Sequence, residues 1–337
     1  MIDFDAIQAQ VAEGYINVQQ HPAADLRIFN YSSKAQFDWH WTPETLVCRG
    51  LIVDGQNQII ARPFPKFFSY EQLNGQVPSE PFEVYEKLDG SLGILYWIED
   101  EPALATRGSF VSEQARRATL IFRERYAHLP FERAHTYLFE IIYPENRIVV
   151  DYGATEELFL LAVIETASGN ELPLPQLGLP VVKRYDGVSD FNELLARQEA
   201  NREGFVVRFQ SGQRVKLKFE DYKRLHKLLT GVSARHIWEI LRAGQDLAAI
   251  IERVPDEYYQ WVRGLEAELR ERYAQIEGQA QRDFKVLGDR KETALYFQTC
   301  ANPGILFSML DGKDYSQHIW KQIRPRGENT FRCDIDA

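Results

Sequence analysis

The amino-acid sequence predicts an α+β protein in which short strands come first and an all-helical part follows. Before about residue 220, apolar residues recur with period two in short runs, as they do in strands with one buried face. From about Tyr222 the period changes to 3.6, which is typical of amphipathic helices. A chain of 337 residues has room for two domains. We place these domains at residues 1–228 and 229–337.

The composition is that of an ordinary globular protein, with 45% hydrophobic and 26% charged residues. The longest apolar run, Leu158–Ile164, is far too short to cross a membrane, and the acidic N-terminus lacks a signal-peptide pattern. Three widely separated cysteines (Cys48, Cys300 and Cys333) show no metal-binding spacing. We therefore expect a cytoplasmic protein that does not bind membranes. Its net charge of −10 argues against nucleic-acid binding through a bulk positive field but allows a local basic cleft.

The strand-rich part begins with a predicted helix at Asp5–Gly14. Leu51–Val53 and Ile59–Ala61 flank Asp54-Gly55, a dipeptide that is typical of hairpin turns. Further strands are expected at Phe82–Glu86, Leu92–Ile98, Thr136–Ile142, Arg147–Val150, Leu158–Ile164, Arg202–Arg208 and Arg214–Lys218. Helices are expected at Glu113–Tyr126 and Asp190–Gln198. The first of these helices carries four arginines, which form either a solvated basic face or a contact surface for a phosphate backbone.

The C-terminal part is expected to consist of helices with recognisable starts. The predicted helices are Ser233–Ile251, Asp256–Leu287, Asp289–Cys300 and Asp314–Ile323. Asp256 follows a proline and is a predicted N-cap, and Asp289 with Glu292 has the spacing of a capping box.

A lysine, an acid and a glycine stand close together at the end of a predicted strand. Lys87, Asp89 and Gly90 directly follow Phe82–Glu86, and the next strand begins at Leu92. A lysine fixed in this way is suited to act as an amine that attacks phosphorus. The alternative is a charged hairpin turn in which Asp89 and Gly90 are merely the turn residues.

Other charged residues stand where a rigid segment or a strand would hold them. Two prolines fix the backbone around Lys66 and Phe68, although a lone lysine of this kind is more often a solvated surface residue. Glu140 lies within an apolar strand, where a carboxylate needs a cationic partner. Lys216 and Lys218 share one strand face and repel each other unless an anion lies between them. The alternative for this pair is an exposed edge strand on which lysine blocks aggregation.

Taken in order, these segments resemble the motifs of the covalent nucleotidyltransferases, and among them the ATP-dependent single-strand RNA ligases of bacteriophages (phage RNA ligase 1-like). The resemblance covers roughly residues 45–225. Lys87–Ser91 matches the motif of the lysine nucleophile. The other matching segments are Arg49-Gly50, Pro65–Phe68, Thr106–Ser109, Phe139–Ile141, Glu203–Val206, Lys216–Lys218 and Tyr222. Arg107 departs from the pattern, because the phage type usually has a lysine there.

The resemblance implies a nucleotidyltransferase fold, with ATP-grasp-like antiparallel sheets flanking a nucleotide cleft, ahead of the helical C-terminal domain. It implies an RNA ligase that joins RNA 3′-hydroxyl and 5′-phosphate ends in RNA repair. In such enzymes the lysine attacks ATP to form lysyl-AMP, AMP passes to the RNA 5′-phosphate, and the 3′-hydroxyl then displaces AMP. The sequence shows no kinase or phosphatase domain, so a separate enzyme would have to heal damaged RNA ends.

The resemblance also assigns roles to individual residues. The implied catalytic residues are Lys87, Lys216, Lys218 and Glu203. The implied ATP-binding residues are Arg49, Lys66, Phe68, Glu86, Leu88, Gly90, Arg107, Glu140, Glu203, Val206, Lys216 and Lys218. Mg²⁺ or Mn²⁺ is expected at Asp89, Glu140 and Glu203, because hard cations prefer oxygen ligands. A free lysine has a pKa of about 10.4, so we expect cations around Lys87 to favour its neutral, nucleophilic form.

Two alternatives stay open. A DNA ligase or an mRNA capping guanylyltransferase would usually have a small β-barrel after the Lys216–Lys218 strand, where this sequence turns helical. A non-catalytic module that binds nucleotide or RNA would not need an intact lysine at position 87. The sequence contains no Walker phosphate loop, no dinucleotide fingerprint and no His-Glu-x-x-His motif, which argues against other enzyme classes.

Overall fold

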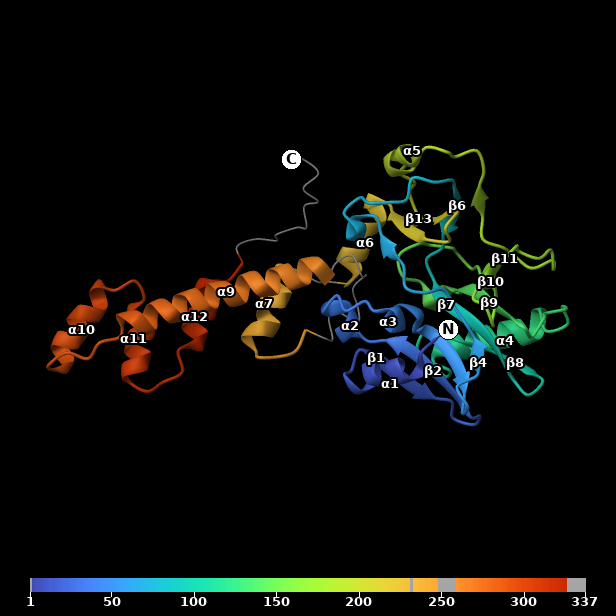
Figure 1. Cartoon of the computed structure of the whole chain (residues 1–337). Helices are drawn as coiled ribbons and strands as arrows, with labels where there is room; N and C mark the ends of the chain where they lie inside the picture. Colours follow the sequence, from blue (N-terminus) through green and yellow to red (C-terminus); the bar gives the residue numbers. More distant parts are fainter. Residues whose placement is uncertain (1, 231–232, 248–258, 326–337) are drawn as a thin grey trace. The chain divides into compact units, whose positions relative to one another are not determined.

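The structure is a computed structural model that describes residues 2–230, 233–247 and 259–325. The chain divides into two compact units, Met1–Leu229 and Thr230–Ala337 (Figure 1). All strands among the described residues belong to the first unit, and the described part of the second unit is built from helices. The predicted N-cap at Asp256 and the third cysteine, Cys333, lie outside the described residues.

The first sheet of the first unit is antiparallel and has the strand order β1-β2-β3-β4. Its strands are β1 (Ile16–Gln20), β2 (Leu26–Tyr31), β3 (Arg49–Asp54) and β4 (Ile59–Ala61). The predicted hairpin is confirmed, because Ile52 pairs with Ala61 and Val53 with Ile59. Three helices precede or connect these strands in the chain, namely α1 (Phe4–Ala12), α2 (Ser33–Phe37) and α3 (Pro43–Val47). Ile7 of α1 is buried in an apolar cluster with residues of β1, β2 and β3.

The second sheet is also antiparallel and has the order β11-β10-β9-β7-β8. Its strands are β7 (Ser91–Ile98), β8 (Glu101–Ala105), β9 (His135–Ile142), β10 (Glu157–Glu165) and β11 (Glu171–Leu172). The helix α4 (Glu113–Arg125) covers one face of this sheet, where Ile121 and Phe122 pack with Phe139 and Leu160.

The third sheet has the order β12-β6-β13-β14-β5 and is antiparallel except for the β14–β5 pair. Its strands are β5 (Phe68–Ser69), β6 (Phe82–Lys87), β12 (Arg184–Tyr185), β13 (Gly204–Phe209) and β14 (Arg214–Lys218). In the chain, a single 3₁₀ turn (Glu71–Leu73) follows β5, α5 (Phe191–Ala196) comes between β12 and β13, and α6 (Glu220–Thr230) follows β14. Phe205, Val207 and Leu217 alternate along β13 and β14 and face the core. Because β14 lies between β13 and β5, it is not the exposed edge strand that the sequence had left as an alternative.

The three sheets meet at one face of the second sheet. On β9, Leu138 belongs to the apolar cluster that packs against the first sheet, whereas Ile142 belongs to the cluster that packs against the third. Glu140 stands between these two residues and points to the same side of the strand. The sheets therefore converge around a carboxylate.

Ion pairs join the third sheet to β11 at the edge of the second. The Glu171 carboxylate contacts Arg214 and lies 3.2 Å from the Nε atom of Arg208. Glu83 of β6 accepts hydrogen bonds from Arg208 at 3.0 Å and from Arg184 at 2.9 Å. Arg208 and Arg214 lie opposite each other at the turn end of the β13–β14 hairpin. These ion pairs therefore lie at that end of the third sheet.

The predicted strand at Arg147–Val150 is wrong. A single 3₁₀ turn at Pro144–Asn146 leads into this segment, which forms a bend. The backbone N–H groups of Val149 and Val150 each donate to the Asp89 carboxylate at 2.8 Å. Both valines are buried, so the apolar run reflects burial of the bend and its N–H groups bind a side chain in place of a neighbouring strand.

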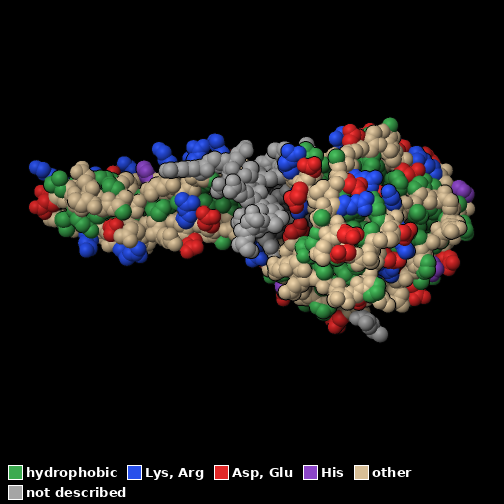
Figure 2. All heavy atoms as spheres, turned by 90° about the horizontal axis from the view of Figure 1, so that it is seen from above, with side chains coloured by type: hydrophobic (Ala, Val, Ile, Leu, Met, Phe, Trp, Pro, Cys, Tyr) green, Lys and Arg blue, Asp and Glu red, His purple; other side chains and the backbone are tan. Residues whose placement is uncertain are grey.

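Three of the four arginines on α4 are paired with acids of the same unit. Arg117 and Arg125 contact Glu156, and Arg123 lies 3.6 Å from Glu101. On the face drawn in Figure 2, basic and acidic side chains are likewise intermixed. For these arginines the structure favours the solvated face over a phosphate-binding surface.

The second unit has its own apolar core. Its described helices are α7 (Ala234–Arg242), α9 (Tyr259–Asp283), α10 (Arg290–Thr299), α11 (Pro303–Leu310) and α12 (Ser316–Gln322). Phe297, Ile305 and Ile319 are buried together in the core. The predicted N-cap at Asp289 is confirmed, because its carboxylate accepts a hydrogen bond from the Glu292 N–H at 2.8 Å. Across the described ranges of the chain, no helix combines the length and the apolar character needed to cross a membrane.

Two glycines of the β13–β14 hairpin provide a test of the backbone packing in the third sheet of the first unit. Gly204 has a φ of +146°, and a Cβ atom there would lie 1.9 Å from the Leu217 carbonyl oxygen. Gly212 has a φ of +85°, but a Cβ atom there would meet nothing within 4 Å. We expect Gly204→Ala to destabilise the protein by about 3 kcal/mol or more, and Gly212→Ala by about 1 kcal/mol. Urea unfolding followed by circular dichroism measures the difference, and equal losses for the two variants would contradict this packing.

Candidate active site

Alternate residues of the third sheet form one polar face. Lys87, at the end of β6, lies opposite Gly204 of β13, which in turn lies opposite Lys218 of β14. Val206 and Lys216 are paired in the next row. Because residues two apart on a strand point to the same side, the three lysines share this face. Gly204 cannot be replaced by a larger residue without strain, because a Cβ atom there would lie 1.9 Å from the Leu217 carbonyl oxygen of the neighbouring strand.

The carboxylate of Glu203 lies between Lys87 and Lys218. Its Oε2 atom lies 2.7 Å from the Nζ atom of Lys87, and its Oε1 atom lies 3.1 Å from the Nζ atom of Lys218. The Glu203 side chain is only 4% exposed, so these two cations supply the partners that a buried carboxylate needs. The sequence had led us to expect cations next to Lys87, yet its closest charged partner here is an acid. The amine is therefore held in an ion pair and must lose a proton before it can act as a nucleophile.

Lys66 lies inside a cage of aromatic rings. Its Nζ atom is 5.3 Å from the ring centroid of Tyr31, 5.2 Å from that of Trp41 and 5.5 Å from that of Phe68. Its exposed fraction is only 5%, so the interpretation of Lys66 as a solvated surface lysine is wrong. Rings at these distances attract a cation through their negative faces and fix its position.

The cage connects to further cations through the neighbouring ring of Phe67. The Arg49 guanidinium lies 5.4 Å from the Phe67 centroid, and the Nζ atom of Lys216 lies 5.4 Å from the same centroid. Arg107 donates to the Tyr31 hydroxyl at 3.0 Å, and its guanidinium lies 5.1 Å from that ring. Cations from β3, from β14 and from the loops before β5 and after β8 are thus brought together around one group of aromatic rings.

Glu140 is the carboxylate at which the three sheets converge. Its Oε1 atom accepts a hydrogen bond from the Gly90 N–H at 2.9 Å. Burial raises the pKa of Glu140 to about 7, against an opposing effect of Lys87, and the negative charges of Glu203 and Asp89 raise it further. Lys87 and Glu203 are therefore close enough to Glu140 to affect its charge.

Asp89 has a structural role in the loop that follows Lys87. Its carboxylate accepts hydrogen bonds from the Tyr222 hydroxyl at 2.7 Å and from the N–H groups of Val149 and Val150. Its own N–H donates to the Tyr152 hydroxyl at 2.8 Å. Both carboxylate oxygens are thus bonded within the protein, which fixes the loop and the end of β6 beside it.

The three carboxylates predicted to bind a metal do not form a common group of ligands. Within residues 2–230, 233–247 and 259–325, no set of three His, Cys, Asp or Glu side chains is arranged to hold a metal ion. Asp89 is bonded to the protein, and Glu203 is bonded to two lysines. Glu140 fits a divalent cation best, because a nearby cation would stabilise the charged form that burial disfavours.

The remaining predicted residues are placed in different ways. Leu88 is buried in the cluster between the second and third sheets, and Phe159 packs against that cluster. The Glu86 carboxylate lies 3.3 Å from Arg202, away from the lysine face, so only its backbone could contact a ligand on that face. A Cβ atom at Gly90 would come within 2.5 Å of the Ile141 carbonyl oxygen, so the close approach here is to the protein's own backbone.

Sequence reasoning missed Tyr31, Trp41 and Tyr152. Tyr31 and Trp41 form part of the Lys66 cage, and Tyr152 accepts the hydrogen bond of the Asp89 N–H. The only available signal for the first two was the density of aromatic residues before the first motif. No local pattern marked Tyr152, because its partner is 63 positions away in the chain.

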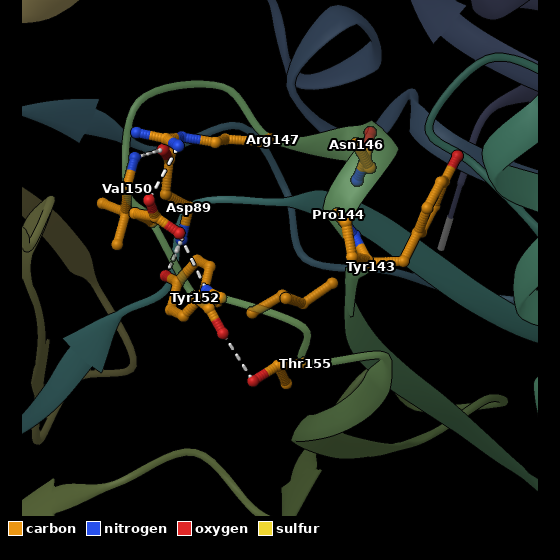
Figure 3. Close-up of a pocket in the computed structure, with 11 residues that line it drawn as sticks. Asp89, Tyr143, Pro144, Asn146, Arg147, Val150, Tyr152 and Thr155 are labelled. Atoms are coloured by element: carbon orange, nitrogen blue, oxygen red, sulfur yellow. Dashed lines mark hydrogen bonds and ion pairs between the residues drawn. The ribbon is translucent and has the colours of Figure 1, made fainter.

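A small cavity lies beside Asp89, and Arg147 of the bend is among the residues that line it (Figure 3). Val150, Tyr152 and Thr155 are among the residues that line it. Its volume of about 110 Å³ suffices for a few water molecules, whereas ligand pockets usually have roughly 300 Å³ or more. Its lining does not include Lys87, so this cavity is separate from the lysine face.

The raised pKa of Glu140 predicts a pH-dependent cost to stability. Below about pH 4.5 the carboxyl is protonated in both the folded and the unfolded chain, and there is no cost. The cost grows as the pH rises from about 4.5 to about 7 and then stays constant, so Glu140→Gln should stabilise the protein at pH 8 by up to roughly 3 kcal/mol. Near pH 4.5 the variant and the wild type should be equally stable.

Thermal unfolding at pH 4.5, 6 and 8 measures this effect. The exposed Glu145 is the matched control, and Glu145→Gln should follow the wild type at every pH. A Glu140→Gln variant that is less stable than the wild type at pH 8 would show that the charged carboxylate is net stabilising, against our expectation.

Comparison with known proteins connects this site to a family. A family model described as RNA ligase matches residues 47–223, more than half of the chain. A protein of Autographa californica nuclear polyhedrosis virus, described as a bifunctional polynucleotide kinase/RNA ligase, is 27% identical over 244 residues, which are 63% of this chain and 35% of that protein. An RNA ligase described from Thermovibrio ammonificans is 28% identical over 227 residues, covering 60% of this chain and 58% of its own. The chain therefore spans between about a third and three fifths of the length of these relatives.

A solved structure described as an archaeal ATP-dependent RNA ligase is more distantly similar. It has 17% sequence identity and a TM-score of 0.46, and the match covers 77% of this chain and 70% of that chain. The family match is the stronger result, because the lysine face, Glu140, Asp89 and the cations around Phe67 all lie within residues 47–223. The chain belongs to the RNA ligase family.

Proposed function

We propose that this protein is an ATP-dependent RNA ligase that joins RNA 3′-hydroxyl and 5′-phosphate ends through a Lys87-AMP and an RNA-adenylate intermediate. The observation that carries the proposal is the position of Lys87. It ends a strand, its amine contacts the buried Glu203 carboxylate at 2.7 Å, and Lys218 contacts the same carboxylate. Membership of the RNA ligase family supports the assignment.

The nucleotide would bind between the second and third sheets, in an ATP-grasp-like cleft of a nucleotidyltransferase domain. The polar face of the third sheet forms one side, with Val206 in the row next to Gly204. Phe159 and Val206 are candidates for packing on the adenine ring, and the backbone of Glu86–Leu88 is the candidate for reading its edge. The second unit would then be a helical domain that takes part in choosing the RNA.

In the first step, the Lys87 amine attacks the α-phosphorus of ATP. An N–P bond forms, the bond from phosphorus to the pyrophosphate oxygen breaks, and the amine proton must leave. Glu203 is the nearest acceptor for that proton, at 2.7 Å. Lys218 remains beside Glu203 and, with Lys216, places positive charge close to the phosphorus that is attacked.

The phosphates of ATP would lie toward the cations around Phe67 and Phe68. Arg49, Lys66 and Lys216 surround these rings, and their charge offsets that of the triphosphate and of the departing pyrophosphate. A divalent ion, Mg²⁺ or Mn²⁺, would supply further positive charge when bound, and Glu140 is our candidate for holding it, because a nearby cation would stabilise its charged form.

In the second step, an oxygen of the RNA 5′-phosphate attacks the AMP phosphorus, and the Lys87 N–P bond breaks. In the third, the 3′-hydroxyl attacks the activated 5′-phosphorus, and AMP leaves with the bonding electrons. The enzyme would act in cytoplasmic RNA repair, on ends that a separate enzyme has healed.

Covalent labelling by the nucleotide tests the first step. Incubation with labelled ATP and Mg²⁺, followed by denaturing electrophoresis, should leave an acid-labile label on the wild type and none on Lys87→Ala, because only a lysine amine forms this bond. Lys183→Ala is the control, since Lys183 is an exposed lysine next to β6 and that variant should label normally. Labelling by GTP in preference to ATP would indicate a capping-type enzyme.

The choice of RNA ends tests the complete reaction. We expect joining of 5′-phosphorylated single strands or of a stem-loop with a cut loop, and no joining of the same RNAs with a 5′-hydroxyl. Adding a polynucleotide kinase with ATP should restore joining of the 5′-hydroxyl RNAs. Gel analysis of the ligated products gives the answer, and joining that is confined to nicked duplexes would contradict the single-strand assignment.

A further inference from the structure

An exposed tryptophan stands at the outer side of the cation–aromatic cluster. Trp39 is 37% exposed, which is high for so large an apolar side chain. Its ring packs against Phe68, with centroids 5.2 Å apart, and meets Trp41 edge-on at 6.1 Å. The ring is therefore supported from behind by the same side chains that surround Lys66, and part of it faces solvent.

The backbone around Trp39 is held in an uncommon conformation. Its φ of +55° is left-handed, which costs a non-glycine residue roughly 1 kcal/mol. The next residue, His40, is fixed by stacking on Tyr15 at 3.8 Å and by a 2.7 Å hydrogen bond with Gln10. The His40 carbonyl also accepts a hydrogen bond from Thr45 at 3.1 Å. The loop is thus anchored, and the exposed ring has a defined position.

Positive charge lies next to this ring. The Lys66 ammonium is 5.5 Å from the Phe68 centroid and 5.2 Å from the Trp41 centroid, the two rings that Trp39 touches. Arg107, which is exposed, lies 5.1 Å from Tyr31, and Tyr31 meets Trp41 at 5.2 Å. An exposed aromatic face beside cations is the combination that binds single-stranded nucleic acids, because bases stack on the ring while phosphates contact the cations.

From these contacts we infer that Trp39 is a stacking platform for a base of the RNA strand being joined, with the adjoining phosphate directed toward the exposed Arg107. A chain with a net charge of −10 needs such local contacts, since its overall field repels RNA. This inference rests on the proposed RNA ligase function and adds to it a site that binds RNA but takes no part in the attack on ATP.

Two substitutions separate stacking from simple packing. Trp39→Leu keeps an apolar side chain against Phe68 but has no ring, whereas Trp39→Phe keeps an aromatic face. Binding of a fluorescently labelled, 5′-phosphorylated single-stranded oligoribonucleotide is measured by anisotropy at 100 mM salt. We expect the Kd to rise at least about fivefold for Trp39→Leu and to stay within about threefold for Trp39→Phe. Val18→Ala is the matched control, at an apolar residue of β1 with an exposed fraction of 39%, and this variant should bind like the wild type.

A strand without bases makes the test specific. On an abasic phosphodiester strand of the same length, Trp39→Leu and the wild type should bind equally, because the ring has no base to contact. A change of less than twofold on the normal RNA, or an equal loss on the abasic strand, would overturn the inference. Covalent labelling by ATP needs no RNA and should be unchanged in Trp39→Leu, and loss of labelling in that variant would show that the residue only supports Phe68 and Lys66. Failure of the wild type to label would instead remove the proposed function itself.

Discussion

The polar face of the third sheet depends on one buried carboxylate held between two ammonium groups. Glu203 is shielded from water, and the attraction of Lys87 and Lys218 offsets the cost of removing its charge from solvent. Gly204, which follows Glu203, is paired with Lys87 on one side and with Lys218 on the other, so the backbone of Glu203 lies next to both lysines. A pair of lysines that would repel each other is thus stabilised, and the Lys87 amine is held in one position by its ion pair.

A second group of charges is organised by aromatic rings. Rings attract a cation through their negative faces, so Phe67 and Phe68 help to hold Lys66, Arg49 and Lys216 in place. Lys87 and Lys218 contact an acid that can accept a proton, whereas the cations expected to bind phosphate lie close to aromatic rings.

Patterns that depend on neighbours in the chain predicted structure well, whereas contacts between distant segments were not visible in the sequence. Period-two alternation predicted β13 and β14 and placed the two lysines of β14 on one face, because the side-chain direction of a strand is set locally. The apolar run Arg147–Val150 was misread as a strand, since its N–H groups bind Asp89, some sixty positions earlier in the chain. Lys66 resembled an ordinary surface lysine, because Tyr31 and Trp41 join its cage only after folding.

The ion pairs of Glu171 have a mechanical consequence for the space between the second and third sheets. They tie β11 to the turn end of the β13–β14 hairpin, whereas Lys218 stands at the opposite end of β14. Two sheets that are joined along one margin separate most readily along the opposite margin. Within the first unit, the ion pairs therefore lie at one margin of the two sheets and Lys87 and Lys218 at the other, which is the margin at which we propose that the nucleotide enters.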